Sequence, residues 1–271
     1  MRARPPLLRW WSWTDGRRTV ADLHLARRVA YALDPVAWAG ELGFETDPWQ
    51  ADVLRSPSGR MLLNCHRQSG KSTTTALLAL HEAVHRPGTL ALLLSPSLRQ
   101  SGELFRKVAD FYGRLAEAVP SEAESALRLE LANGSRIVSL PGKEATVRGY
   151  SGVSLLIVDE AARVPDELYF SIRPMLAVSG GRLVTLSTPF GKRGWWWLEW
   201  SEGGSDWLRV EVPADQCPRI SPEFLEEERR HLGEWWYRQE YLCEFQEDIA
   251  AVFRAETVDA LLSQEVEPWD F

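Results

Sequence analysis

The residues best suited to chemistry in this 271-residue chain form a short polar loop that ends in Gly70-Lys71-Ser72. The apolar run 61–63 precedes the loop, and an alanine- and leucine-rich segment follows it. Backbone N–H groups of such a loop, with the positive end of the next helix, attract anions. Gly70 would let the backbone approach phosphates, Lys71 would reach the β- and γ-phosphates, and Ser72 would offer its hydroxyl to Mg²⁺. The pattern predicts a phosphate site, although Cys65 stands where the full motif has glycine.

Two acidic residues, Asp159 and Glu160, form a second reactive group directly after the apolar run 155–158. The carboxyl end of a buried parallel strand is where ligands of open α/β sheets bind. An aspartate there can hold Mg²⁺, and the neighbouring glutamate can orient and deprotonate an attacking water. The pair favours hydrolysis over simple binding. The alternative is that both acids only cap the following helix.

Gln50 lies upstream of the loop, and the hydroxyl residues Ser187 and Thr188, followed by Pro189, end another apolar run at 182–186. A glutamine amide can donate to and accept from an adenine edge, although Gln50 could equally be a residue of a helix start. The hydroxyl residues could sense a γ-phosphate and relay its loss. The sequence therefore predicts one recognition residue before the loop and one coupling segment after it.

Hydrophobic periodicity indicates the elements that must position these side chains. Buried strands are expected at 61–63, 89–95, 155–158, 182–186 and 207–212. Helices are expected at 20–42 with a break at Asp34-Pro35, after Ser72, from Ser97 to about Val119, after Ser221-Pro222, and at 235–245. Asn133-Gly134 between two alternating segments predicts a β-hairpin. We expect an α/β fold with a mostly parallel sheet and an antiparallel insertion.

The composition is that of an ordinary globular protein, with 45% hydrophobic and 25% charged residues. No apolar run approaches the roughly 18 residues of a membrane span, and three scattered cysteines suggest neither disulfides nor zinc. The net charge of −7 argues against a generally basic nucleic-acid binder but leaves a local basic surface open.

Two basic groups could supply such a surface. Residues 1–20 contain arginines interleaved with tryptophans. Such a segment could be an arm that contacts nucleic acid, but we favour an N-terminal extension whose tryptophans pack on the domain. The cations Arg99, Arg106 and Lys107 lie on one expected helix and could line a DNA path, although such charges are commonly a solvated face.

Taken in order, these motifs resemble the ATPase domain of a tailed-bacteriophage large terminase subunit, the motor that packages viral DNA. The resemblance covers most of residues 44–253 and rests on Asp47-Pro48-Trp49-Gln50, the loop 66–72, Val147-Arg148-Gly149, the acidic segment 156–161, Ser187-Thr188-Pro189-Phe190-Gly191, and a closing segment from Trp236 through Glu240-Tyr241 to Phe245.

The resemblance implies a P-loop NTPase of the ASCE type with a small C-terminal lid subdomain. The implied organisation is a basic and aromatic arm with helices at 1–43, an ATPase core at 44–213, and the lid with the start of a linker at 214–271. Because the chain ends soon after the closing segment, we expect the nuclease domain of large terminases to be absent.

The resemblance also implies residue roles. Gln50 matches the adenine contact, and the residues that would hold the phosphates are Arg67, Gln68, Ser69, Gly70, Lys71, Ser72 and Thr73. Ser72 and Asp159 match the Mg²⁺ ligands, Glu160 the catalytic glutamate, and Ser187, Thr188 and Pro189 the coupling motif. Arg67 and Arg148 compete for the charge-stabilising role. We favour Arg148 acting on a neighbouring subunit, with Arg67 acting in its own site.

The implied function is Mg²⁺-dependent ATP hydrolysis that drives double-stranded DNA into a procapsid. Implied partners are DNA, the portal and the small terminase subunit, with a homo-oligomeric ring when assembled and a monomer when isolated, and no membrane. The implied location is the host-cell cytoplasm, on the procapsid, and not the mature virion. Two alternatives remain: a helicase-like DNA translocase, for whose second lobe the length leaves no room, and a nucleotide-gated binding module without turnover, against which Glu160 argues.

Overall fold

The computed structural model describes residues 20–142, 147 and 149–247. Within this part of the chain one sheet of eight strands runs in the order β3-β4-β5-β2-β6-β7-β1-β8. The strands are β1 (Arg60–Cys65), β2 (Leu90–Ser95), β3 (Ser121–Ser125), β4 (Arg128–Leu131), β5 (Arg136–Pro141), β6 (Leu155–Asp159), β7 (Arg182–Ser187) and β8 (Leu208–Val212).

The sheet is parallel from β5 through β2, β6, β7 and β1 to β8. At the other edge, β4 pairs antiparallel with β5, and β3 pairs antiparallel with β4. β7 separates β1, which leads into the phosphate loop, from β6, which ends in Asp159. The expected α/β fold, mostly parallel with a β-hairpin insertion, is confirmed. The additional edge strand β3 was not expected, because its residues are all exposed and show no apolar alternation.

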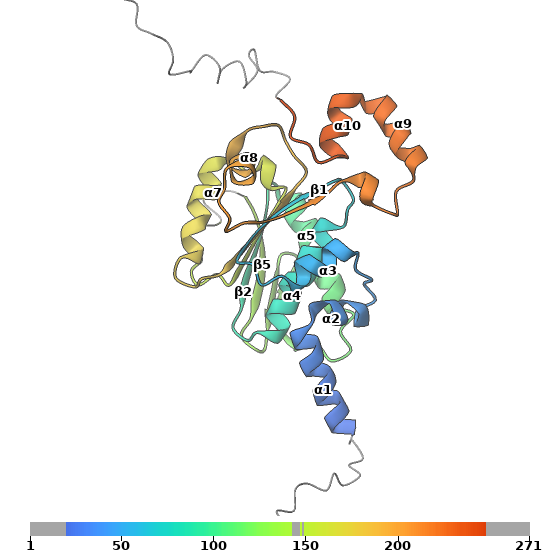
Figure 1. Cartoon of the computed structure of the whole chain (residues 1–271). Coiled ribbons are helices and arrows are strands. Elements are labelled where there is room, and N and C mark those ends of the chain that lie inside the picture. Colours follow the sequence, from blue (N-terminus) through green and yellow to red (C-terminus); the bar gives the residue numbers. More distant parts are fainter. Residues whose placement is uncertain (1–19, 143–146, 148, 248–271) are drawn as a thin grey trace, which may run out of the picture.

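Helices cover both faces of the sheet (Figure 1). On one side lie α2 (Pro35–Glu41), α3 (Pro48–Arg55), α4 (Lys71–His85) and α5 (Leu98–Tyr112), and on the other α7 (Asp166–Ile172) and α8 (Gly194–Ser201). α1 (Val20–Leu33) extends away from the body, and α9 (Pro222–Leu232) and α10 (Glu234–Glu240) form a separate pair at the opposite end. Short 3₁₀ turns occur at Ala161–Arg163, Arg173–Leu176 and Ala214–Gln216.

Side-chain caps explain several helix starts. Asp34, Ser97 and Ser221 accept hydrogen bonds from the backbone N–H groups of Val36, Gln100 and Phe224, so each satisfies one free donor of its helix. Two helices are shorter than expected. α5 ends at Tyr112, not near Val119, because the chain turns back there and the Tyr112 hydroxyl donates to the Val119 carbonyl at 2.7 Å. α10 ends at Glu240, short of residue 245.

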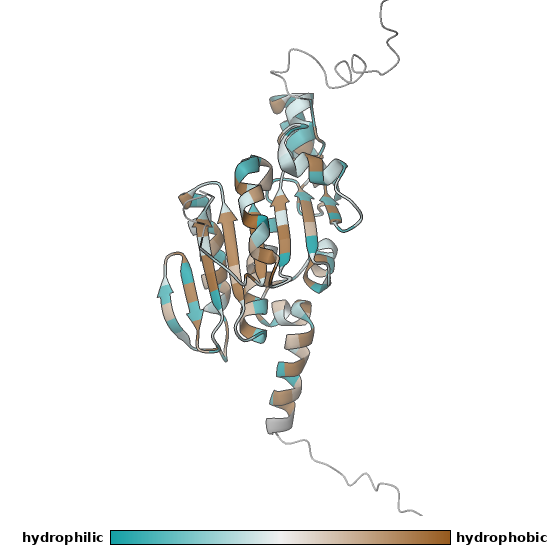
Figure 2. Ribbon diagram, turned by 90° about the vertical axis from the view of Figure 1, so that its left-hand side faces the viewer, coloured by the Kyte–Doolittle hydropathy of each residue, from teal (hydrophilic) through white to brown (hydrophobic). Residues whose placement is uncertain are grey.

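The core has one apolar layer on each face of the sheet, and the central strands are mostly brown in Figure 2. Every residue of β2 is buried, as expected for a parallel strand covered on both sides. On the α7–α8 side, Trp195 stacks on Tyr169 with ring centroids 3.8 Å apart, and Trp196 is also buried. Both tryptophans are therefore packing residues. No helix within the described ranges is long and apolar enough to cross a bilayer.

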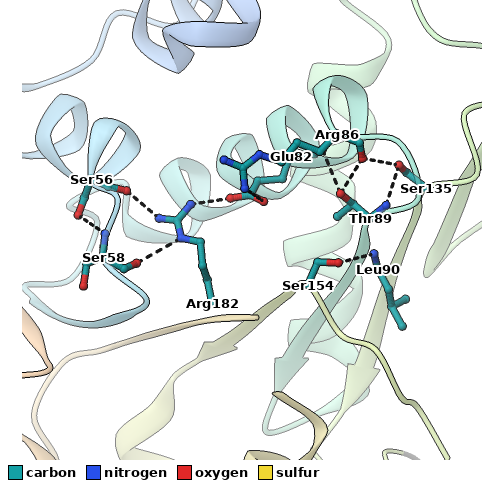
Figure 3. Close-up of polar contacts among 9 residues, drawn as sticks. All are labelled: Ser56, Ser58, Glu82, Arg86, Thr89, Leu90, Ser135, Ser154 and Arg182. Atoms are coloured by element: carbon teal, nitrogen blue, oxygen red, sulfur yellow. Dashed lines mark hydrogen bonds and ion pairs between the residues drawn. The ribbon is translucent and has the colours of Figure 1, made fainter. Parts of the chain in front are cut away.

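A buried ion pair ties three elements together at the amino-terminal edge of the sheet (Figure 3). Glu82 of α4 has a side chain only 4% exposed, and Arg182 of β7 lies 2.5 Å from it. Arg182 also donates to the carbonyls of Ser56 and Ser58, while Arg86 contacts the other Glu82 oxygen at 3.1 Å. Desolvated charges of this kind are stable only while they stay paired.

The variant Arg182→Met removes the main partner of Glu82. We expect the free energy of unfolding to fall by about 2–4 kcal/mol, since only Arg86 would then face the buried carboxylate. Urea denaturation measures this change. The matched control is Arg106→Met, which breaks an exposed pair with Glu103 and should cost less than about 1 kcal/mol. Equal losses in both variants would contradict the stabilising role of the buried pair.

Candidate active site

The phosphate loop joins β1 to α4 and depends on one glycine. Gly70 is the residue before α4 and has a φ of +92°, in the left-handed region. The left-handed conformation therefore favours glycine, and a Cβ atom built there would stand 2.7 Å from Nε2 of Gln50 and displace that side chain. The 15-residue helix α4 then presents its free N–H groups to the loop, which is an anion-binding arrangement.

Three side chains meet beside this helix start. Lys71 is buried and its Nζ donates to the Cys65 carbonyl at 3.3 Å. The Ser72 hydroxyl donates to Oδ2 of Asp159 at 3.0 Å. Burial raises the pKa of Asp159 to about 6, the adjacent Glu160 carboxylate adds to the rise, and Lys71 and Ser72 oppose it. Two strands that are not neighbours in the sheet thus bring a hydroxyl and a carboxylate into contact, with the Lys71 ammonium near enough to lower the pKa of that carboxyl.

Cys65 takes the place of the leading glycine of the motif without harm to the loop. Its side chain is buried, and burial raises the pKa of the thiol to about 12. The thiol therefore stays neutral near pH 7 and adds no negative charge beside the phosphate site.

Glu160 follows Asp159 with a left-handed backbone, φ 52° and ψ 42°, which is unusual for a residue with a side chain. Its N–H donates to Oδ1 of Asp159 at 3.0 Å, and its carboxylate pairs with Arg163 at 3.0 Å. The turn directs Glu160 to an open cavity of about 450 Å³ above the loop. The residues that line it are Arg67, Gln68, Gly70, Lys71, Ser72, Thr73, Lys107 and Glu160.

The oxygen atoms at this position suit Mg²⁺. A serine hydroxyl and a carboxylate are hard ligands, and Mg²⁺ in nucleotide sites commonly takes few protein ligands beside waters and phosphate oxygens. Within the described ranges no group of three or more His, Cys, Asp or Glu side chains offers a richer metal site. Ser72 and Asp159 therefore fit the magnesium role that we expected for them.

Gln50 lies against the loop and is nearly inaccessible, at 3% exposure. Its Oε1 accepts the N–H of Asp47 at 2.9 Å, and its Nε2 points to the Ser69 carbonyl at 3.5 Å. A cavity of about 240 Å³ adjoins this position. Its lining residues are Asp47, Pro48, Trp49, His66, Ser69, Glu211, Val212, Gln216, Cys217 and Pro218. Burial lowers the pKa of His66, and neither of its buried ring nitrogens has a hydrogen-bond partner among the described residues.

The expected coupling residues Ser187, Thr188 and Pro189 are all buried at the end of β7. Ser187 stands opposite Asn64 in the β1–β7 register, one residue before the end of the strand that enters the loop. The next turn reaches α10, because the N–H of Gly191 donates to Oε1 of Gln239 at 3.1 Å. This segment therefore touches both the phosphate strand and the C-terminal helices.

The three residues considered for DNA contact do not share one surface. Arg99 and Arg106 are exposed on α5, with Arg106 paired to Glu103 at 2.9 Å, whereas Lys107 lines the phosphate cavity. Arg148, the arm 1–19 and the terminal stretch 248–271 lie outside the described residues.

Sequence reasoning missed two residues of the site, Arg163 and Glu240. Arg163 pairs with Glu160, and Glu240 of α10 pairs with Arg67 at 2.8 Å. The spacing of Arg163 three residues after Glu160 was visible in the sequence, but the 3₁₀ turn that makes them neighbours was not. No local pattern links residue 240 to residue 67.

The phosphate loop, the acidic strand placed one strand away and the strand between them define a P-loop nucleoside triphosphatase fold. Residues 63–259 match the family described as terminase large subunit, T4likevirus-type, N-terminal, and the chain belongs to this family.

Similar proteins include two curated terminase large subunits. The protein of Thermus virus P23-45 is 28% identical over 243 residues, covering 78% of this chain and 49% of that protein. The protein of Escherichia phage T5 is 25% identical over 203 residues, covering 72% and 46%. The chain thus spans about half the length of the curated relatives it matches.

Similar solved structures include the large terminase ATPase domain of Thermus phage P74-26. It has a TM-score of 0.68 at 26% identity and covers 77% of this chain and 97% of that one. A large terminase from a thermophilic bacteriophage, solved in complex with ATP-gamma-S, has a TM-score of 0.57 at 15% identity and covers 73% and 52%. This second likeness bears on the fold alone.

The variant Asp159→Asn tests how much stability the protein loses by holding the buried Asp159 carboxylate ionised. The folded pKa, about 6, exceeds the usual 3.8, so the stability that the carboxyl contributes falls as pH rises between these values and stays reduced above them. We expect Asp159→Asn to raise the free energy of unfolding by about 1–2 kcal/mol near pH 7 and by little near pH 4. Urea denaturation at both pH values measures the gain. An unchanged stability near pH 7 would contradict the cost of holding this carboxylate ionised.

Proposed function

We propose that this chain hydrolyses ATP with Mg²⁺ between the phosphate loop and the end of β6. The observation that carries the proposal is the 3.0 Å contact of the Ser72 hydroxyl with Asp159, beside Glu160 and in the cavity that Lys71 lines. Membership of the terminase large subunit family supports it, as does the presence of ADP and of ATP-gamma-S in two structures of the thermophilic-bacteriophage terminase.

In the proposed reaction, the loop N–H groups and Lys71 bind the phosphates, with Lys71 exchanging the Cys65 carbonyl for phosphate oxygens. Mg²⁺, when bound, would neutralise the negative charge that develops on the phosphates. Ser72 and Asp159 would hold it. Glu160 orients the attacking water and accepts its proton, and its position at the cavity wall suits that role.

We assign the base of the nucleotide to the smaller cavity beside Gln50. The neutral imidazole of His66 lines it with both ring nitrogens free of hydrogen bonds among the described residues. One nitrogen of a neutral histidine donates and the other accepts, which suits a base edge. Gln50 would contribute mainly its Nε2 group, because its Oε1 already accepts a short hydrogen bond from Asp47.

The wider proposal is that ATP turnover drives double-stranded DNA into a procapsid, in a ring of copies of this chain, with portal and small terminase subunit as partners in the host cell. We assign residues 44–213 to the ATPase core and residues from 214 onward to a lid. Support for the lid comes from the separate small core of Ala214, Leu225 and Tyr237 under α9 and α10. Ser187 to Pro189 would couple turnover to lid movement through the contact of Gly191 with Gln239.

Turnover is tested by phosphate release from Mg²⁺-ATP over a series of protein concentrations. We expect Glu160→Gln to lower the rate by about 10²–10⁴-fold while a fluorescent ATP analogue still binds, because only the proton acceptor is lost. Lys71→Ala should weaken binding of the analogue itself. ATP binding by the unaltered chain without phosphate release at any concentration would favour the nucleotide-gated binding module instead.

The role of Arg148 is tested by mixing two inactive variants, Arg148→Ala and Glu160→Ala. If Arg148 completes a neighbour's site, mixed rings contain some intact sites and regain part of a rate that the arginine raises by about 10³–10⁵-fold. A mixture of Lys71→Ala with Glu160→Ala is the control, since both residues belong to one chain's own site and no intact site can form. The absence of recovery under conditions where rings assemble would rule out action on the neighbour.

A further inference from the structure

Four charged side chains form a continuous line across the site, which we call the ion-pair chain. Arg67 of the phosphate loop lies 2.8 Å from Oε2 of Glu240, and Arg163 lies 3.8 Å from the other oxygen of Glu240. Arg163 also lies 3.0 Å from Glu160. The ion-pair chain therefore runs from the phosphate loop through α10 to the end of β6, and its charges alternate.

The middle of the ion-pair chain is the least exposed part. The side chain of Glu240 is 11% exposed, against 26% for Arg163 and 66% for Arg67. Although Arg67 is close, Oε2 of Glu240 accepts no well-aligned hydrogen bond among the described residues. Burying a carboxylate costs free energy, and an ion pair without a well-aligned hydrogen bond offsets little of that cost. Such a carboxylate can therefore exchange one cation partner for another, because a charge-assisted hydrogen bond would stabilise it better. Glu240 is thus poised to strengthen its contact with either arginine.

Arg163 is the point where three functional segments meet. Besides Glu160 and Glu240, its guanidinium lies 4.7 Å from the ring centre of Phe190, directly after the coupling residues. The neighbour of Glu240 on α10, Gln239, is buried and accepts a hydrogen bond from Gly191 in the same turn. A shift of α10 would therefore act on Arg163 from two sides, through Glu240 and through the turn at 190–191.

We propose that Arg163 is a positioning residue for Glu160 and that Glu240 ties it, together with Arg67, to α10. This inference rests on the proposed ATPase function. A γ-phosphate in the cavity, which Arg67 lines, competes with Glu240 for Arg67. Glu240 then has Arg163 as its remaining cation, so phosphate binding is transmitted to the carboxylate that activates water and to the lid helix at once.

The test compares Arg163→Met with the matched control Arg173→Met. Arg173 makes the same kinds of contact away from the site, an ion pair with Glu199 at 3.7 Å and a stack on Tyr169. We expect Arg163→Met to lower kcat by about 10- to 100-fold, because a displaced catalytic group loses that much, while the KM for ATP stays within about twofold. Arg163→Lys should restore part of kcat, and Arg173→Met should keep the full rate.

Two further variants separate the possible failures. Glu240→Gln combined with Arg163→Met should be no slower than Arg163→Met alone, because both act through one ion-pair chain. If the double variant lowers kcat by the product of the two single losses, or if Arg163→Met has a normal kcat, this inference is overturned. The ATPase proposal stays intact in both cases, provided that Glu160→Gln is inactive. A drop in kcat with an equal rise in KM would also overturn it, since Arg163 would then act on nucleotide binding. No turnover in the unaltered chain would instead overturn the proposed function.

Discussion

The parallel pairing of β1, β7 and β6 is the constraint on which the site depends. Because all three strands run in one direction, the phosphate loop, the coupling residues and the acidic pair leave the sheet at the same edge. The register sets Ser187 beside Asn64 and Leu186 beside Asp159, so β7 lies between the two halves of the site. The hydrogen bond from Ser72 to Asp159 joins the two halves of the site past the end of β7. Apolar layers on both faces hold the three strands, and a slip of one residue would move every side chain to the opposite face and disrupt the packing of both layers.

The C-terminal helical pair is attached to this edge in a different way. Its own core is small, with three buried residues and three partly buried ones packed against them, and several polar contacts join it to the phosphate strand and loop. Asn64 donates to the Cys243 carbonyl at 2.8 Å, the Arg67 N–H donates to the Glu240 carbonyl at 3.4 Å, and the Arg67 side chain pairs with Glu240. Polar contacts can be exchanged at lower cost than an interlocked apolar core can be repacked. The attachment of the helical pair to the sheet edge therefore relies on polar contacts in a way that the packing of the central strands does not.

Local patterns in the sequence predicted the phosphate loop and the strands other than β3, and they singled out Ser72 and Asp159, whose side chains the structure brings into contact. The apolar runs before Gly70 and Asp159 are long enough and regular enough to predict buried strands, and Asn133-Gly134 predicts its hairpin, since these signals act over a few residues. The expected start after Ser221-Pro222 and the expected break at Asp34-Pro35 likewise match the beginnings of α9 and α2. Signals of the same kind failed at helix ends, where α5 stops at Tyr112 because of a hydrogen bond to a carbonyl in the following segment.

Only the tertiary structure decided which distant charges face one another. Lys107 was a candidate for a DNA path or a solvated helix face, and it lines the phosphate cavity, because α5 packs beside α4. Arg163 belongs to no motif, and the closing segment that contains Glu240 gave that residue no role in the site; their places beside Glu160 and Arg67 follow from the 3₁₀ turn after β6 and the return of α10 to the sheet edge. The phosphate loop could be read from sequence because its geometry is built by adjacent residues. The ion-pair chain could not, because Coulomb interactions depend on separation in space, and residues 67, 163 and 240 become neighbours only after the chain has folded.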